Sequence, residues 1–446
     1  MKALSGYVSS RATPAHGSTR RTVAVIAYKA SADAVSKTAT LVVMIVAART
    51  LPAPDFGVLA LAMTTGWLLS VASDAGLPLD LSKQIARTAT DGARPPFALV
   101  RDTMRLRLAF AAVAALAGAA AGAALVPRSW LPAFVLVVLA QLLNATLETL
   151  AHAFRGLGRS EVDASVSLVQ RSVGAVAACT VLAMWPSLLW VGVALIAPPA
   201  LALAVSSIVA WRLTAHDASG TGPNPLRARF AREIAPVGVA IVLSALYFRC
   251  DVYFVSRWHG LETVGMYNAA FRIVEALRLL PAAVMAVMFP LFCQSRSWSP
   301  LTGVLWALGP AAVILAALVY IGAAPVMTTM YGDPFGAAAP ALQLLALSIP
   351  LFFVNYALTH QVIAWDGQRA YLRITAAALV ANIGANLLLI PTGGMQGAAI
   401  ATLLTEVVVA AGCGWALLRG RPDRRGKPAL GRPVALEVPR ASGEGL

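Results

Sequence analysis

The sequence has little charge and few metal-binding side chains. Only 12% of its 446 residues are charged, whereas about a quarter are charged in a typical soluble domain. The four cysteines (Cys179, Cys250, Cys293 and Cys413) are isolated within apolar stretches, and the five histidines form no cluster. We therefore expect no metal, no cofactor and no disulfide framework, and an ordinary soluble enzyme is excluded.

Motifs for covalent or nucleotide-driven chemistry are missing as well. The chain contains no phosphate-binding loop of the Walker A type, so we expect no ATP-driven step within it. No polar segment between apolar stretches is long enough to hold a glycosyltransferase domain. We therefore predict that the protein is not an enzyme.

The chain has long apolar stretches instead. Apolar residues make up 59% of the sequence, and the mean hydropathy is +0.73. About 20 such residues cross a bilayer as one helix, and proline and glycine turn signals separate the stretches. We predict an all-α polytopic membrane protein with twelve spans, at residues 22–48, 56–79, 104–126, 130–153, 162–184, 187–211, 234–256, 263–291, 301–326, 337–360, 370–391 and 396–418.

The positive charge follows a membrane topology. With the N-terminus inside, alternate loops and the two tails hold 23 lysines and arginines, whereas the opposite loops hold three. Such a bias is the positive-inside signal, so the net charge of +15 indicates no nucleic-acid partner. We predict a multi-pass protein of the bacterial inner membrane with both termini in the cytoplasm.

The predicted spans fall into two halves of six. A flexible segment rich in glycine, proline and serine separates them. The predicted organisation is a basic tail (1–21), an N-terminal bundle (22–212), a cytoplasmic linker (213–233), a C-terminal bundle (234–418) and a second basic tail (419–446). The second tail either lies on anionic membrane lipids or is a disordered segment that sets the topology.

The two halves contain a faint sequence echo. Leu51–Leu61 and Gly260–Ala269 each follow a span, turn at a glycine (Gly57 or Gly265) and continue into an alanine-rich helix. Internal repeats are typical of transporters. A short glycine turn also recurs by chance, so the echo is weak evidence by itself.

Charged residues within the spans mark the candidate site. Each costs about 2.5–3.5 kcal/mol at a helix centre on insertion scales, so such residues usually face a cavity or a partner. The candidates are Lys29, Asp33, Lys37, Asp74, Arg171, Arg249, Asp251, Arg272, Glu275, Arg278 and Glu406.

Two triplets among them have a spacing of three or four residues, which places each along one helix face. The triplets are Lys29, Asp33 and Lys37, and Arg272, Glu275 and Arg278. In each triplet an acidic residue lies between two basic residues. This order fits internal salt bridges that pack a polar face inside a bundle, or a wet cavity that keeps positive charge for a phosphate-bearing ligand.

A diphosphate group suits the second interpretation. Arginine can bind phosphate oxygens through two parallel N–H bonds, and lysine supplies a point charge. The four cations of the triplets are the leading candidates, followed by Arg249 and Arg171. The candidate coupling or cavity carboxylates are Asp33, Asp74, Asp251, Glu275 and Glu406. Asp74 and Glu406 have a packing pair as their alternative interpretation, and Asp251 has a structural pair with another helix.

Aromatic side chains in the spans have two interpretations. They can stack on sugar rings, or they can serve in packing and in the interfacial belts of a membrane protein. The residues concerned are Tyr28, Trp67, Tyr247, Tyr253, Tyr267 and Tyr356.

A specific pattern lies at residues 245–292. It contains an aspartate late in the seventh span, a short turn, G-x-Y-x-A-A, and R-x-x-E in a helix that ends near a proline. The matching residues are Asp251, Gly265, Tyr267, Ala269, Ala270, Arg272, Glu275 and Pro290, with further matches at Phe56-Gly57, Ser73–Leu77, Pro340–Ala346 and Gly393–Thr402. In these residues the chain resembles the polysaccharide flippases of the MATE-like multidrug/oligosaccharidyl-lipid/polysaccharide exporter superfamily, over residues 22–420.

The resemblance implies a fold and an activity. The fold would be two six-helix bundles in a V around a central cavity that opens to one side at a time. The substrate would be a polyprenyl-diphosphate-linked oligosaccharide, moved from the cytoplasmic to the periplasmic leaflet. Polysaccharide polymerase and assembly proteins would be candidate partners.

Two rival functions stay open. Related drug and cation antiporters carry a coupling carboxylate in the first helix, which makes Asp33 a candidate site for a proton or sodium ion. In that case the carboxylates would matter more than the arginines. The other rival is a non-transporting membrane scaffold, whose intramembrane charges would form internal salt bridges only.

Overall fold

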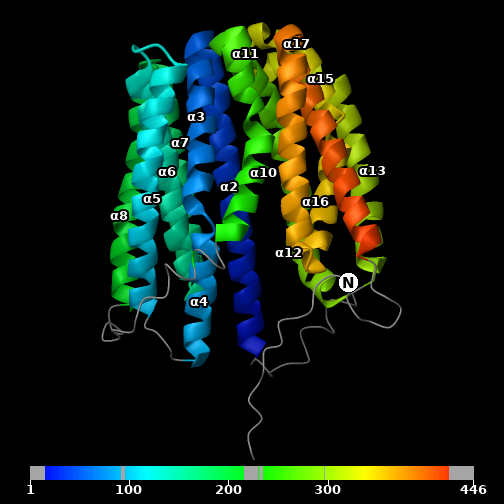
Figure 1. The fold of residues 1–446 in the computed structure, drawn as a ribbon. Helices are drawn as coiled ribbons and strands as arrows, with labels where there is room; N and C mark the ends of the chain where they lie inside the picture. Colours follow the sequence, from blue (N-terminus) through cyan, green and yellow to red (C-terminus); the bar gives the residue numbers. More distant parts are fainter. Residues whose placement is uncertain (1–15, 92–95, 215–229, 231–234, 296, 421–446) are drawn as a thin grey trace, which may run out of the picture.

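The molecule consists of long helices that run side by side along one axis (Figure 1). The computed structural model describes residues 16–91, 96–214, 230, 235–295 and 297–420, and no strand occurs in this part of the chain. Most helices are apolar around their whole circumference, as expected where lipid covers the outside. A helix also satisfies its own backbone hydrogen bonds, which a membrane interior requires.

The N-terminal half is built from α2 to α8. One of these helices, α4, is a shorter amphipathic continuation of α3. Their bounds are α2 (His16–Thr50), α3 (Ala53–Asp74), α4 (Leu77–Asp91), α5 (Pro96–Leu125), α6 (Leu131–Gly156), α7 (Ser160–Met184) and α8 (Leu188–Thr214).

The C-terminal half has more interrupted helices. Short breaks divide several of its crossings into two pieces. The bounds are α10 (Ala235–Arg249), α11 (Asp251–Leu277), α12 (Leu279–Gln294), α13 (Ser299–Ile321), α14 (Ala323–Tyr331), η3 (Asp333–Ala338), α15 (Ala339–Ala346), α16 (Ile349–Ala364) and α17 (Gln368–Arg419).

The described helices make the twelve crossings that the sequence predicts. Eight stretches are long and apolar enough to span a membrane, and two of them, Gly238–Gln294 and Gln368–Arg419, turn back part-way. The turns lie at Gly260 (φ 81°) and Gly394 (φ 53°), where glycine adopts positive φ without a Cβ clash. Each stretch therefore crosses twice. The first helix, α2, whose apolar part is Thr38–Thr50, and the bent pair of η3–α15 with α16 bring the number to twelve.

Two predicted spans end differently. The second span ends at Asp74 and not at 79, because Ala75 and Gly76 have positive φ (45° and 84°) and separate α3 from α4. The eighth predicted span is divided at Arg278, between α11 and α12. In both cases the hydropathy runs continuously across the break, so the sequence pattern merges the two pieces.

The predicted linker and tails lie largely outside the described residues. What is described shows that the first residue of α2 and the last residue of α17 lie at the same end of the molecule (Figure 1). We call this the near end. The opposite end, with the turns before α3 and at Gly260 and Gly394, is the far end.

The two halves meet closely at the far end, where α3 crosses α11. A Cβ added to Gly57 would lie 1.8 Å from the carbonyl oxygen of Leu261, and a Cβ added to Gly265 would lie 2.9 Å from the Phe56 ring. The glycines of the two echoing segments therefore pack against each other across the interface between the halves. No larger residue fits at either position without moving the backbone.

A polar contact and a ring contact reinforce this far-end interface. Arg49, at the end of α2, donates from Nε to the carbonyl oxygen of Met330 at 2.8 Å and from Nη2 to that of Thr329. These are carbonyls of the last turn of α14, where a cation is favoured by the helix dipole. Phe56 also meets Phe335 edge to face, with ring centroids 5.6 Å apart. The far end is thus closed in this conformation.

Candidate functional site: the central cavity

A cavity of about 870 Å³ lies between the two halves. This is within the usual range of about 300–1,000 Å³ for ligand sites. Its lining residues are Ser36, Thr38, Thr40 and Leu41 of α2; Met63, Thr64 and Trp67 of α3; Gln141, Glu148 and Arg155 of α6; Ser167 and Arg171 of α7; Arg249 of α10; Arg272, Glu275 and Ala276 of α11; and Leu279 of α12.

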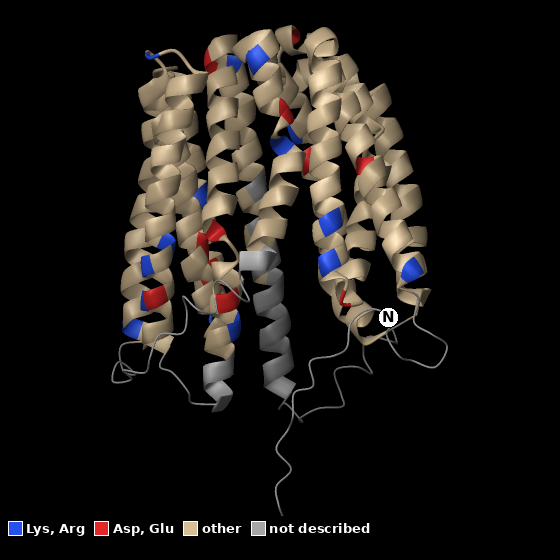
Figure 2. Cartoon of the chain, viewed as in Figure 1, with Lys and Arg blue, Asp and Glu red and all other residues tan. Residues whose placement is uncertain are grey.

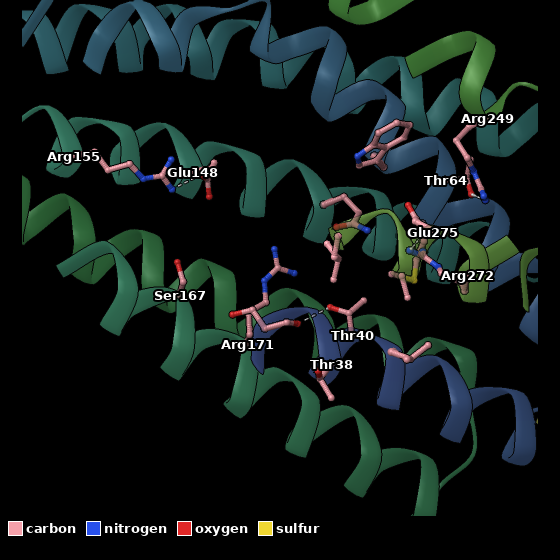
Figure 3. A pocket seen from close by; sticks show the side chains of 17 residues that line it. Thr38, Thr40, Thr64, Glu148, Arg155, Ser167, Arg171, Arg249, Arg272 and Glu275 are labelled. Atoms are coloured by element: carbon pink, nitrogen blue, oxygen red, sulfur yellow. Dashed lines mark hydrogen bonds and ion pairs between the residues drawn. The ribbon is translucent and has the colours of Figure 1, made fainter. Parts of the chain in front are cut away.

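The cavity is positively charged. Four arginines but only two glutamates line it among the described residues. Figure 3 shows Arg155 and Glu148 at one end of the cavity, Arg249, Arg272 and Glu275 at the other, and Arg171 between the two groups. Figure 2 shows the same feature at the scale of the molecule, since acidic and basic residues lie at mid-height in the helices as well as at their ends.

We call the end with Arg249, Arg272 and Glu275 the inner end of the cavity. There, both guanidinium groups form hydrogen bonds with other side chains of the protein. Arg272 Nη1 donates to Glu275 Oε2 at 2.9 Å, one turn along α11. Arg249 is 4% exposed and donates from Nη2 to Thr64 Oγ1 at 3.0 Å and to Asn268. Because Thr64 belongs to α3, Arg249 ties the halves together at the inner end of the cavity.

Another cluster of charges lies where α6 and α7 meet near their connection. Arg155 donates from Nε to Asp163 Oδ2 at 2.7 Å and from Nη2 to Glu148 Oε1 at 2.6 Å. The His152 ring lies 3.1 Å from Nη1 of the same arginine. Two carboxylates thus surround one guanidinium, which leaves Arg155 little capacity to bind another anion.

Arg171 is the most available cation of the lining. Its side chain extends from α7 into the cavity (Figure 3). It makes no hydrogen bond or ion pair of 4.0 Å or less with any residue that the structure describes, although the charge of Glu148 is near enough to act on it. A guanidinium in this setting has all five N–H donors to offer a ligand.

Arg278 lies away from the cavity lining. Its guanidinium packs over the rings of Phe248, at 4.0 Å, and Phe352, at 4.7 Å. The sequence spacing placed Arg278 on one face with Arg272 and Glu275. The break between α11 and α12 falls at this residue, so Arg278 contacts aromatic rings of the C-terminal half instead.

Three of the predicted carboxylates are absent from the lining of the central cavity. Asp251 is buried and accepts hydrogen bonds from the Tyr267 hydroxyl and the Val252 N–H. Glu406 is buried between α16 and α17 and accepts from Asn355 Nδ2 at 2.7 Å.

Asp74, the third of these carboxylates, forms an ion pair with Arg107 in the N-terminal half. The distance from Arg107 Nη2 to Asp74 Oδ1 is 3.0 Å, and the Arg107 side chain is fully buried. This pair joins α3 to α5. Sequence reasoning overlooked Arg107, although its place inside the third predicted span was a signal that could have found it.

The first triplet cannot be placed in the same detail. Lys29, Asp33 and Lys37 belong to α2, but their side chains lie outside the described residues. Their roles as phosphate ligands or coupling site stay predictions. Of the predicted site residues, the structure therefore brings Arg171, Arg249, Arg272 and Glu275 together in one cavity.

Several lining residues are neutral and were not predicted. Gln141 and the hydroxyl residues of α2 and α7 have no charge to draw attention in an apolar span, and only their shared cavity reveals them. Within the described part of the chain, no group of three or more His, Cys, Asp or Glu side chains could hold a metal ion.

Comparison with known families identifies the chain. The model of the polysaccharide biosynthesis protein family matches residues 23–296, more than half of the sequence. The chain belongs to this family. The resemblance to polysaccharide flippases is thereby confirmed at the level of the family. No sequence among curated proteins matches the chain.

Solved structures show the same fold. A multidrug resistance MATE family transporter of the MOP superfamily, in an inward-facing conformation, superposes with a TM-score of 0.72 at 15% identity, covering 86% of this chain and 94% of that one. The lipid II flippase MurJ, inward closed, gives 0.58 at 12% identity, with 87% of each chain covered. The Vibrio cholerae MATE transporter VcmN, in the bent form, gives 0.59 at 12%, with 89% and 97% covered. This family member is therefore a polytopic helical membrane protein with the MOP transporter fold.

Proposed function

We propose that this protein moves a polyprenyl-diphosphate-linked oligosaccharide from the cytoplasmic to the periplasmic leaflet of the bacterial inner membrane. It would do so by alternating access, in the assembly of exopolysaccharide, capsule or O-antigen. The observation that carries the proposal is Arg171, which lies in the cavity between the halves and has no hydrogen-bonding partner among the described residues. Charge placed in a membrane interior without a partner usually serves a ligand.

The rest of the cavity supports an anionic ligand. Arg272 and Arg249 lie at its inner end, so a diphosphate at Arg171 has further cations to move toward. A diphosphate can compete with Glu275 for Arg272, because phosphate oxygens bind guanidinium in the same bidentate way as a carboxylate. When the substrate binds, its diphosphate would replace the Glu275 carboxylate at Arg272, and when it leaves, Glu275 would return.

The direction of movement follows from the topology. The positive-inside bias of the sequence supports a cytoplasmic near end. The far end is closed by the contacts of Arg49 and Phe56 and by the crossing of α3 and α11 at Gly57 and Gly265. This conformation would therefore be open to the cytoplasmic side. Both termini would then be cytoplasmic. MurJ, whose fold this chain shares, is itself a lipid II flippase.

A cation-coupled multidrug or small-molecule antiporter is the second candidate. It is favoured by the higher TM-score with the multidrug MATE transporter. The excess of arginine over glutamate in the described lining suits anions, whereas cationic drugs need the reverse. The scaffold hypothesis would require paired charges only, which the position of Arg171 does not favour.

The test is the fate of the lipid-linked intermediate in a deletion strain of the source organism. We expect the polyprenyl-linked oligosaccharide to accumulate and surface polysaccharide to be lost, with both defects reversed by restoring the gene. An unchanged intermediate, together with altered sensitivity to drugs or ions, would overturn the flippase proposal and favour the antiporter.

A further inference from the structure

The N-terminal wall of the central cavity offers hydrogen-bond acceptors. Ser36 Oγ donates to the carbonyl oxygen of Ala32 at 2.7 Å, and Thr40 Oγ1 donates to that of Ser36 at 3.2 Å. Ser167 Oγ donates to Asp163 Oδ1 at 3.2 Å. A hydroxyl has one proton and two lone pairs. Because each proton is engaged within its own helix, these three hydroxyls have acceptor capacity left for a ligand.

Gln141 adds a free amide to this wall. It makes no hydrogen bond with any residue that the structure describes, although it lines the cavity. Its side chain packs against Gly66 of α3, since a Cβ on Gly66 would lie 2.8 Å from Gln141 Cβ and 2.9 Å from Cγ. Trp67, which follows Gly66 in α3, is 37% exposed and lines the same cavity.

A side chamber opens beside this wall, between α2, α6 and α7. It measures about 60 Å³ and shares Thr40, Gln141 and Arg171 with the central cavity. Asn144 and Gln170 also line it, and Gln170 Nε2 donates to Asn144 Oδ1 at 3.2 Å. Most of the chamber lining is apolar, with a few polar side chains and Arg171 as its charged group among the described residues, and the chamber is large enough for a small substituent only.

The donor and acceptor pattern distinguishes the parts of a lipid-linked sugar. A diphosphate diester carries acceptors only, so acceptor hydroxyls do not attract it. Sugar hydroxyls donate, and the apolar face of a sugar ring can lie on an indole. We propose that Gln141, Trp67 and the hydroxyls of Ser36, Thr40 and Ser167 form a subsite for the sugar next to the diphosphate, with the side chamber accepting one small substituent of its ring. This inference rests on the proposed function, because Arg171 would hold the adjoining diphosphate.

Binding of two lipids to the purified full-length protein tests the subsite. One probe is undecaprenyl diphosphate, and the other is the lipid-linked oligosaccharide extracted from the deletion strain. The variants are Gln141→Leu, which removes the amide, and Thr40→Val, which removes a hydroxyl at nearly constant volume. The matched controls are Gln368→Leu, exposed at the start of α17, and Thr50→Val, whose hydroxyl makes the same bond one turn back on α2 outside the cavity.

We expect the wild type to bind the oligosaccharide lipid about tenfold more tightly than undecaprenyl diphosphate. Loss of one or two neutral hydrogen bonds should lower this preference about fivefold in each variant and leave binding of undecaprenyl diphosphate unchanged. The controls should behave as the wild type.

Three outcomes would overturn the subsite. Equal binding of both lipids by the wild type would show that the sugar is not recognised, while the proposed function would survive. An equal loss for both lipids in either variant would indicate a structural role for these side chains. Binding of neither lipid by the wild type would reject the flippase function itself, and the subsite with it.

Discussion

The arginines of this molecule differ in how many of their hydrogen-bond donors are available to a ligand. Arg171 has no hydrogen-bonding partner among the described residues, whereas Arg155 is surrounded by Glu148 and Asp163. Arg278 packs against two aromatic rings. The sequence could predict which charges lie inside spans. It could not predict these differences, because they depend on partners that are distant in the chain.

Replacing Arg171 should impair export. We expect Arg171→Gln to lower transport and the affinity for undecaprenyl diphosphate by about 10- to 100-fold, since a hydrogen bond to a charged group contributes about 1.5–3 kcal/mol. Arg212→Gln, an exposed site at the end of α8, is the matched control. Normal export by Arg171→Gln at normal protein level would exclude this residue as the diphosphate ligand.

The Asp74–Arg107 pair should contribute to stability and not to ligand binding. Arg107→Met leaves a carboxylate without its partner and should destabilise the fold by about 3–5 kcal/mol, whereas the double change with Asp74→Asn should recover part of this loss. Unfolding of the purified variants in detergent measures both effects. A double variant as unstable as the single one would show that the two residues are not coupled.

At the scale of elements, hydropathy predicted the number and approximate place of the crossings. It could not locate the break at Ala75–Gly76 or at Arg278, because apolar residues continue on both sides. The echo between Leu51–Leu61 and Gly260–Ala269 was weak evidence in the sequence. In the structure its two glycines are in contact, which gives the echo a physical meaning.

The glycine crossing between α3 and α11 should not tolerate a methyl group. Gly57→Ala places its Cβ 1.8 Å from a backbone oxygen, so the helices must separate, at a cost of about 1–3 kcal/mol or more. We expect lower thermal stability and loss of the closed far end. Gly309→Ala in α13, where the new Cβ meets nothing within 4 Å, is the control and should be neutral or stabilising. Equal stability of the two variants would argue against a close crossing.

For the whole molecule, the far-end contacts hold the two halves together at one end of the cavity. Arg49 is their polar component, and Arg49→Gln should shift the population toward a far-end-open state. Spin labels at exposed positions 128 and 257, on opposite halves of the far end, would report a longer mean distance than in the wild type. Labels at positions 159 and 369, at the near end, should report a shorter mean distance than in the wild type. Unchanged distances at both ends would remove Arg49 from the gating of the cavity.

The most direct test of the central claim is lipid movement in a purified system. The wild-type protein, Arg171→Gln and Arg212→Gln would each be reconstituted into vesicles with the lipid-linked oligosaccharide from the deletion strain. The fraction of its sugar accessible from outside would then be followed over time. We expect wild type and Arg212→Gln to equilibrate the lipid between leaflets, and Arg171→Gln to do so at least about tenfold more slowly. A wild-type rate equal to that of protein-free vesicles would contradict the flippase function.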